Sequence, residues 1–396
     1  MKPISFISPS RNNLTYLKWM YNSIRKNVGY YHEILLADDC SEDGTWEWLQ
    51  EIKKTDQNIQ IFRNDTGERQ GIVYWYDYLC EKAQNDVVMF LHADMYVTPK
   101  LDVEIDKHIK PGVVVTATRI EPSLHPPGPE KILADYGIEP EEFEEQQFLR
   151  DLRKFKQGKT TEGIFAPWAI YKDDYWAVGG HDKLFAPQSK EDSDIFNRLQ
   201  LNGCKFIQTW DGFVYHMTSR GSRFNPMAGG APGKDSPEWL HTTTKNMRNF
   251  IRKWGSVVKH DELMKPIIQP KYNMGFVITN CTYQMLELLE PWCDKIWVDT
   301  DDEKVMQYKL KEQQNTTYDL NKRIYPITPS IKRDDIDTDI VITFDGNLLT
   351  QDSFNWVMEF PNILTDSGEV GELELGIFKF EIDKLKTYEQ ELIKCN

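Results

Sequence analysis

The sequence predicts an α/β fold, with a mostly parallel, Rossmann-like sheet flanked by helices and then a second, smaller α/β domain. Short apolar runs alternate with segments of helical periodicity from residue 3 to residue 92. The apolar run inside residues 86–92 is unbroken, as is typical of a strand buried on both faces of a sheet. The same alternation begins again near residue 270, which indicates the second domain.

The first part of the chain is expected to alternate strands and helices. Apolar side chains at Leu14, Leu17 and Ile24 show the helical spacing. Strands and helices that alternate at this distance predict parallel strands joined by right-handed crossovers. The expected strands are residues 3–8, 33–37, 59–64 and 86–92, and the expected helices are residues 14–26, 46–53 and 71–83.

The middle of the chain should complete the first domain. Residues 121–163 are rich in proline, glutamate and glutamine and predict a helical insert with a solvated acidic face, before strands and a helix return over 164–217. Residues 219–237 are rich in glycine and proline, so we expect a mobile, lid-like loop there. A helix should follow over 237–253.

We therefore expect two domains, at residues 1–265 and 270–396. The first divides into halves at 1–118 and 119–265, and the second is expected to be a small accessory domain. Its predicted elements are strands at 274–279, 295–298 and 339–345 and a helix at 283–289.

Composition excludes several classes of protein. The formal net charge of −15 disfavours non-specific binding to nucleic acid. The six cysteines are scattered without a Cys-x-x-Cys spacing, so a disulfide framework or zinc site is not expected and a reducing cytoplasm fits. The amino-terminal apolar run is too short for a signal sequence, and no run of 18 apolar residues predicts a membrane span.

Polar residues follow four predicted strands in turn. Ligands of an open parallel sheet bind beyond the carboxyl ends of its strands, so these residues predict one binding site. They are Pro9-Ser10-Arg11, Asp38-Asp39, Asn64-Asp65-Thr66-Gly67 and His92-Ala93-Asp94.

These segments resemble the family 2 glycosyltransferases and their GT-A relatives, including bacterial and virus-encoded members, over roughly residues 3–217. The resemblance implies a GT-A fold and transfer of a sugar from a nucleoside diphosphate, most commonly UDP, to a glycan or other hydroxyl acceptor. The matching segments, in the family's order and spacing, are Ser8–Asn12, Ala37–Thr45, Gly71, Leu91–Met95, Gly179–Asp182, Glu191–Asp194 and Val214–His216.

By this resemblance, the half at 1–118 holds the nucleotide sugar. Asp38 and Asp39 would accept hydrogen bonds from the nucleoside, although Asp39 could instead cap the turn before Ser41. Arg220 and Arg223, on the loop, would close over the diphosphate. The remaining residues expected at the nucleotide are Pro9, Ser10, Arg11, Asp65, Gly71, His92 and Ala93.

His92-Ala93-Asp94 stands where the family has an Asp-x-Asp metal motif. Asp94 would supply the carboxylate that Mn²⁺ or Mg²⁺ prefers, whereas His92 is expected to face the ribose. His216 resembles a late histidine that completes the metal shell in some relatives, and an imidazole ligand favours Mn²⁺. A buried structural role for His216 stays open.

Glu191 and Asp192 resemble the acidic pair beside the acceptor. In inverting relatives one such carboxylate deprotonates the acceptor hydroxyl, and we expect Asp192 to be this base with Glu191 second. The alternative is that both merely complement a helix dipole. The expected acceptor-binding residues are Trp168, Gly180, His181 and Asp182.

Other functions stay open at this point. A degenerate module that binds nucleotide sugars without catalysis is one. A virus-type enzyme acting on hydroxymethylated DNA bases is another, which the acidic charge disfavours. A nucleotidyltransferase is disfavoured because the loop after the first strand, residues 9–13, has neither glycine nor lysine. The sequence predicts neither the sugar, the acceptor nor the oligomeric state.

Overall fold

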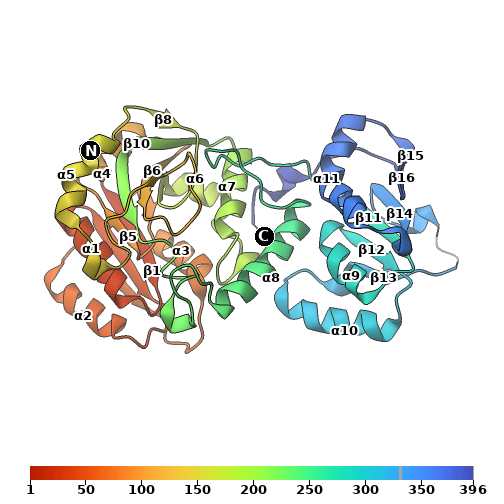
Figure 1. Cartoon of the computed structure of the whole chain (residues 1–396), viewed down its shortest axis with the longest axis horizontal. Coiled ribbons are helices and arrows are strands. Elements are labelled where there is room, and N and C mark those ends of the chain that lie inside the picture. The colour runs from red at the N-terminus through yellow and green to blue at the C-terminus, as the bar shows by residue number, and fades with distance from the viewer. Residues whose placement is uncertain (330–331, 396) are drawn as a thin grey trace. The chain divides into compact units, whose positions relative to one another are not determined.

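The structure is a computed structural model that describes residues 1–329 and 332–395. Residues 330–331 and 396, which the predicted second domain includes, lie outside the described residues. The chain forms two compact units (Figure 1). The first unit comprises residues 1–243, 260–267 and the end of the chain from residue 394, and the second comprises residues 244–259 and 268–393.

The first unit is built on a large sheet with strand order β3-β2-β1-β4-β9-β6-β10-β5. Its first four strands are parallel, as predicted, because each buried strand is followed by an amphipathic helix that returns the chain to the same edge. The strands are β1 (Ile4–Ser10), β2 (Glu33–Asp38), β3 (Ile59–Arg63) and β4 (Val87–Phe90), and the helices are α1 (Leu14–Asn27), α2 (Thr45–Thr55) and α3 (Gly71–Lys82).

The other half of this sheet is mixed. Strand β9 (Trp168–Tyr171) lies antiparallel to both β4 and β6 (Val113–Glu121). The long β10 (Lys205–His216) runs parallel to β6 and antiparallel to β5 (Met95–Val97). This pairing brings the end of β10 to the segment that follows β4, and it builds the site described below.

The first unit has further helices in the predicted insert and in the segments on either side of it. Phe148 of the insert helix α5 is buried with its ring 5.3 Å from that of Tyr215 on β10, so the insert packs on the sheet. The bounds are α4 (Leu101–His108), α5 (Glu145–Phe155), α6 (Lys172–Ala177) and α7 (Glu191–Leu201), with short strands β7 (Ile132–Leu133) and β8 (Thr160–Thr161). Helix α8 (Pro237–Trp254) begins in the first unit, and its residues from 244 onward belong to the second.

The second unit has its own six-stranded sheet, which confirms the predicted smaller α/β part. Its strand order is β13-β12-β11-β14-β16-β15, and the first four strands are parallel. They are β11 (Met274–Thr279), β12 (Lys295–Val298), β13 (Ile324–Pro326) and β14 (Ile340–Asp345), followed by the antiparallel pair β15 (Gly371–Leu375) and β16 (Phe378–Ile382). The helices are α9 (Tyr283–Leu289), α10 (Asp302–Glu312) and α11 (Gln351–Ser367).

A buried ion cluster lies inside the second unit. The Glu290 carboxylate accepts hydrogen bonds from Arg323 Nε at 2.7 Å and from Arg252 Nη2 at 2.6 Å. Burial alone would raise the pKa of Glu290, but these guanidinium groups lower it to about 2. The cluster ties the end of α8 to the segment between α9 and β12.

Candidate active site

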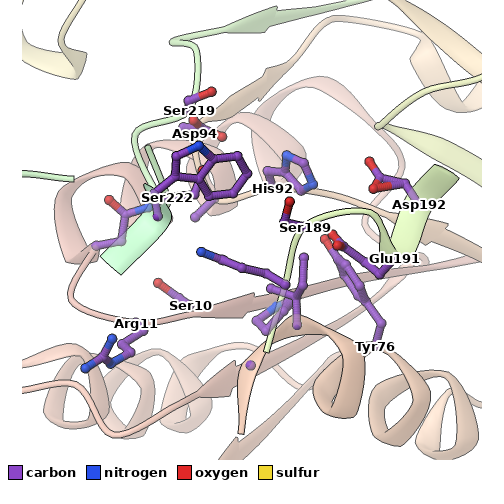
Figure 2. A pocket seen from close by; sticks show the side chains of 18 of the residues that line it. Ser10, Arg11, Tyr76, His92, Asp94, Ser189, Glu191, Asp192, Ser219 and Ser222 are labelled. Carbon is purple, nitrogen blue, oxygen red and sulfur yellow. The ribbon is translucent and has the colours of Figure 1, made fainter. Parts of the chain in front are cut away.

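A cavity of about 350 Å³ lies at the carboxyl ends of β1, β2 and β4 in the first unit. The starts of α3 and α7 and the loop after β10 complete its wall. Figure 2 shows that His92, Asp94, Glu191 and Asp192 surround the same space. The predicted site residues that line the cavity are Pro9, Ser10, Arg11, Asp39, Gly71, His92, Ala93, Asp94, Glu191, Asp192 and His216.

Three candidate metal ligands gather on one side of this cavity. The β10–β5 register places His216 opposite Met95, the residue after Asp94. Ligand atoms of His92, Asp94 and His216 all lie within 4.8 Å of one another. His216 Nε2 is 3.5 Å from Asp94 Oδ1, and it is buried without a hydrogen-bond partner among the described residues. The group therefore fits a divalent cation.

The chemistry of this set also fits such an ion. One carboxylate and two imidazoles are typical ligands for Mn²⁺ and similar first-row metals. Burial lowers the pKa of His216, but the carboxylates of Asp94 and Glu121 raise it to about 9, because both favour positive charge at this position. The sequence placed His92 nearer the ribose, whereas the structure groups it with Asp94 and His216.

Glu121 fixes the orientation of His216. The Nδ1–H of His216 donates to Glu121 Oε1 at 2.7 Å, which leaves Nε2 turned toward Asp94. Arg119 and Lys131 lie 3.3 Å and 3.1 Å from the Glu121 carboxylate. Their positive charges outweigh burial and hold the pKa of Glu121 far below its usual range. The charged Glu121 carboxylate therefore holds the His216 ring in place through its hydrogen bond with Nδ1–H.

The loop after β10 is folded back on itself. Arg223 donates to both carboxylate oxygens of Asp235, at 2.8 Å and 3.1 Å. The backbone N–H of Arg220 donates to Asp94 Oδ2 at 2.7 Å, while its buried guanidinium lies 3.1 Å from Glu139 of the insert. Both predicted phosphate-binding arginines thus have protein partners, and neither lines the cavity.

Asp39 orders the nucleotide side of the cavity. Its carboxylate accepts hydrogen bonds from the backbone N–H groups of Gln70 at 3.0 Å and Gly71 at 2.8 Å. The turn before Ser41 is capped instead by Asp38, whose Oδ1 accepts from the Ser41 N–H at 3.0 Å. Asp38 is buried beneath the cavity wall, and Asp65 lies in an exposed loop 3.5 Å from Arg63. Neither of these two predicted residues lines the cavity.

Gly71 is required by a close approach of two backbones. Its φ is +82°, and a Cβ at this position would lie 2.2 Å from the carbonyl oxygen of Pro187. Glycine alone tolerates both conditions. The start of α3 can therefore lie against the segment that leads into α7.

Two arginines of the cavity share one carboxylate. Arg11 Nη1 is 3.3 Å from both oxygens of Glu238, at the start of α8, and Arg69 also pairs with Glu238. Burial and the nearby Arg11 lower the pKa of Arg69 to about 10. The sequence did not identify Arg69 or Glu238, because nothing local indicates that α8 returns to the first loop.

Glu191 and Asp192 begin α7 and face the cavity with different environments. Glu191 is buried, its Oε2 has no hydrogen-bond partner among the described residues, and burial together with the Asp192 charge raises its pKa well above the usual range. Asp192 is the more exposed of the pair. Two neighbouring carboxylates that differ in burial are typical of acid–base sites.

The predicted acceptor residues are buried, except Asp182, which is half-buried. The Trp168 ring stacks on Phe90 with centroids 4.0 Å apart, and the His181 N–H donates to Asp77 at 2.9 Å. The Asp182 carboxylate accepts from the Leu184 N–H at 2.9 Å. Trp168, Gly180, His181 and Asp182 are not among the residues that line the cavity, so their acceptor-binding role stays a prediction.

Several further residues of the cavity were not identified from the sequence. They lie in helices, a strand and loops whose local sequence carries no sign of a binding site. They are Arg69, Tyr76, Arg119, His125, Lys190 and Trp239. Within the described part of the chain, no helix combines the length and apolar character needed to cross a membrane.

Known proteins match part of this chain in sequence. Residues 5–178 match the model of the family described as glycosyl transferase family 2. Over 91 residues the chain is 32% identical to TuaG of Bacillus subtilis (strain 168), a protein named for a glycosyltransferase of teichuronic acid biosynthesis. This match covers 23% of the chain and 35% of TuaG, so the chain spans about a third of that relative.

Solved structures are similar at low sequence identity. GalNAc-T7 with UDP, GalNAc and Mn²⁺ is 16% identical, with a TM-score of 0.45 over 64% of this chain and 51% of that one. A fragment of S. aureus TarS is 15% identical, with a TM-score of 0.41 over 63% and 65%. A mannosyltransferase of Pyrobaculum calidifontis with GDP-Man and Mn²⁺ is 15% identical, with a TM-score of 0.43 over 64% of each chain.

The predicted fold class is a mostly parallel GT-A sheet followed by a smaller sheet. The strand orders of the two units and the family match confirm it. The part of this chain that matches the glycosyl transferase family 2 model is residues 5–178, somewhat less than half of its length.

Proposed function

We propose that the chain is a metal-dependent glycosyltransferase. It moves a sugar from a nucleoside-diphosphate donor, for which UDP is our first choice, to an acceptor hydroxyl. The observation that carries this proposal is the juxtaposition in one cavity of the His92–Asp94–His216 group and the Glu191–Asp192 pair. Oxygen and imidazole ligands suit Mn²⁺, and the carboxylate pair suits proton transfer.

Each side of the cavity has a separate task. Asp39 and the glycine turn at Gly71 would receive the nucleoside, with Pro9 and Ser10 in the same wall. A divalent cation held by His92, Asp94 and His216 would neutralise charge on the diphosphate.

Asp192 acts as the base in this proposal. It takes the proton of the acceptor hydroxyl while that oxygen forms a bond to the anomeric carbon. The bond from the anomeric carbon to the phosphate oxygen breaks, and its electron pair leaves with the nucleoside diphosphate. Attack from the face opposite the leaving group inverts the anomeric configuration.

The test is donor binding and slow donor hydrolysis over a panel of UDP-, GDP- and dTDP-sugars, with Mn²⁺ or with EDTA. We expect one donor to bind and be cleaved only with Mn²⁺, and Asp94→Ala to abolish both. Asp65→Ala is the matched control, because Asp65 is exposed and does not line the cavity. If no donor binds in the presence of Mn²⁺, the proposal is wrong. Binding without any cleavage or transfer would identify a nucleotide-sugar-binding module instead.

A further inference from the structure

One cation of the cavity differs from the others in its partners. Arg11 and Arg69 pair with Glu238, and Arg119 pairs with Glu121. The ammonium group of Lys190, which also lines the cavity, forms no ion pair or hydrogen bond with any residue that the structure describes. A cation that faces a cavity without a protein counter-ion is available to an anionic ligand.

The backbone at Lys190 gives no local reason for lysine. Lys190 is the residue before the first turn of α7, with φ +71° and ψ −5°, and its side chain makes no capping hydrogen bond. Lysine has no acceptor atom to cap a helix, and this left-handed conformation favours glycine or asparagine. Ser189 is also left-handed, with φ +78°. Such backbone strain clusters at functional sites, so the role of Lys190 is to be sought in the cavity.

Charged side chains of α7 and of the loop after β10 act on the Lys190 ammonium group. Burial lowers the pKa of Lys190, Asp192 and Glu191 raise it, and Arg223 on the loop lowers it again. The ammonium group thus lies near both the acidic start of α7 and the loop after β10. Because the pKa of Glu191 is raised well above its usual range, that neighbour contributes little negative charge at neutral pH.

We propose that Lys190 binds the diphosphate group of the donor and of the nucleoside-diphosphate product. This inference rests on the proposed function. The diphosphate of the donor gains one further negative charge as the sugar leaves, so the product carries more negative charge than one divalent cation neutralises, and Lys190 supplies the missing positive charge. As the bond from the anomeric carbon to the phosphate oxygen breaks, its electron pair moves to that oxygen. The Lys190 N–H group then donates a hydrogen bond to the phosphate, and no proton is transferred.

The experiment measures the binding of UDP, GDP, UMP and GMP in the presence of Mn²⁺ by calorimetry. Lys190→Met should lower the affinity for the diphosphate that the wild type binds, UDP or GDP, by about tenfold or more. A hydrogen bond to a charged group contributes binding free energy of this size. The affinity for the corresponding monophosphate, UMP or GMP, should change much less. Lys190→Arg should restore most of the diphosphate affinity. The control is Lys183→Met, which removes an exposed lysine outside the cavity.

A second variant separates binding from folding. Lys190→Gly removes the cation but suits the left-handed backbone, so it should lose diphosphate affinity like Lys190→Met while its melting temperature stays equal or rises. The affinity for Mn²⁺ alone should not change in either variant.

The outcomes distinguish two failures. A wild type that binds none of the four nucleotides contradicts the proposed function itself. A wild type that binds UDP or GDP, with equal affinity in Lys190→Met, overturns the role of Lys190. The role is overturned as well if Lys190→Met weakens binding of the monophosphate as much as binding of the diphosphate.

Discussion

Glu121 and His216 form a buried pair across the first unit's sheet, with His216 Nδ1 2.7 Å from Glu121 Oε1. Glu121 is the last residue of β6 and His216 the last of β10, so the parallel pairing of these strands brings the two side chains together. The hydrogen bond fixes which nitrogen of the imidazole faces Asp94. Carboxylates behind a ligating histidine typically tune metal affinity.

Glu121→Gln should therefore weaken Mn²⁺ binding. The amide keeps the shape of the side chain but loses the charge that makes the imidazole a good ligand, and we expect a loss of about 10- to 100-fold in affinity. Titration of free Mn²⁺ by electron paramagnetic resonance measures it without any substrate. Glu141→Gln, at an exposed residue, is the control. Unchanged Mn²⁺ affinity in Glu121→Gln would show that the pair is only structural.

Glu238→Gln should strengthen donor binding. Glu238 occupies both Arg11 and Arg69 in the structure, and its removal frees two guanidinium groups that line the cavity. Because partly exposed ion pairs contribute about 0.2–1 kcal/mol, the gain in UDP affinity should be at most about fivefold. Calorimetry with Mn²⁺ present measures it. Weaker UDP binding would mean instead that Glu238 holds the arginines in place for the ligand.

Glu191→Gln and Asp192→Asn should differ in activity. Glutamine resembles the neutral form in which burial and Asp192 hold Glu191. Its kcat should therefore stay within about tenfold of the wild type, whereas loss of the base at Asp192 should lower kcat by about 10²- to 10⁴-fold. Single-turnover transfer assays give both values. Equal losses would exclude this division of roles.

Glu191 should also make stability fall as pH rises. Its pKa is raised in the folded state, so the unfolded chain binds fewer protons once pH exceeds the usual glutamate value. The destabilisation grows from the unfolded pKa upward through the folded pKa. Glu191→Gln should thus melt higher than the wild type at pH 8, and the two should converge below about pH 4. Melting curves over this range provide the measurement, and parallel curves would contradict the raised pKa.

Gly71→Ala should destabilise the first unit more than Gly67→Ala. Both glycines have positive φ, at +82° and +79°, but a Cβ meets Pro187 only at position 71, while position 67 is open. The left-handed strain is common to both variants, so their difference reports the collision with Pro187. We expect Gly71→Ala to cost at least about 1–3 kcal/mol more than the control, as overpacking does. Thermal melts measure this, and equal costs would show that the α3 start can move.

Glu290→Gln should destabilise the second unit. It leaves Arg323 buried with a neutral partner and Arg252 with Glu312 as its remaining carboxylate, and breaking a buried ion pair costs about 3–5 kcal/mol. Because the folded pKa of Glu290 is about 2, its contribution is present above the usual glutamate pKa and is lost as pH falls toward 2. Urea unfolding at pH 7 and pH 3 measures both effects, with the exposed Glu303→Gln as control. A variant as stable as the wild type at pH 7 would contradict the prediction.

The sequence by itself determined the first four strands, the helices between them and one edge of the site. Apolar runs such as the one ending at Phe90 and the helical spacing after Asn13 are local patterns, and they predicted β1 to β4 with their crossovers. The residues that follow these strands, including Asp39 and Asp94, were predicted at one edge because parallel strands end there together, and the structure places both in the cavity wall.

Only the tertiary structure decided which distant residues complete that edge. Three contacts join segments that are far apart in sequence. Strand β9 inserts antiparallel beside β6, the β10–β5 register brings His216 beside Asp94, and the start of α8 brings Glu238 to Arg69. Local periodicity determines what a segment forms but not its pairing partner, which depends on burial and hydrogen bonding of the whole sheet. The stacking of Trp168 on Phe90 likewise depends on the pairing of β9 with β4, which no local pattern predicts.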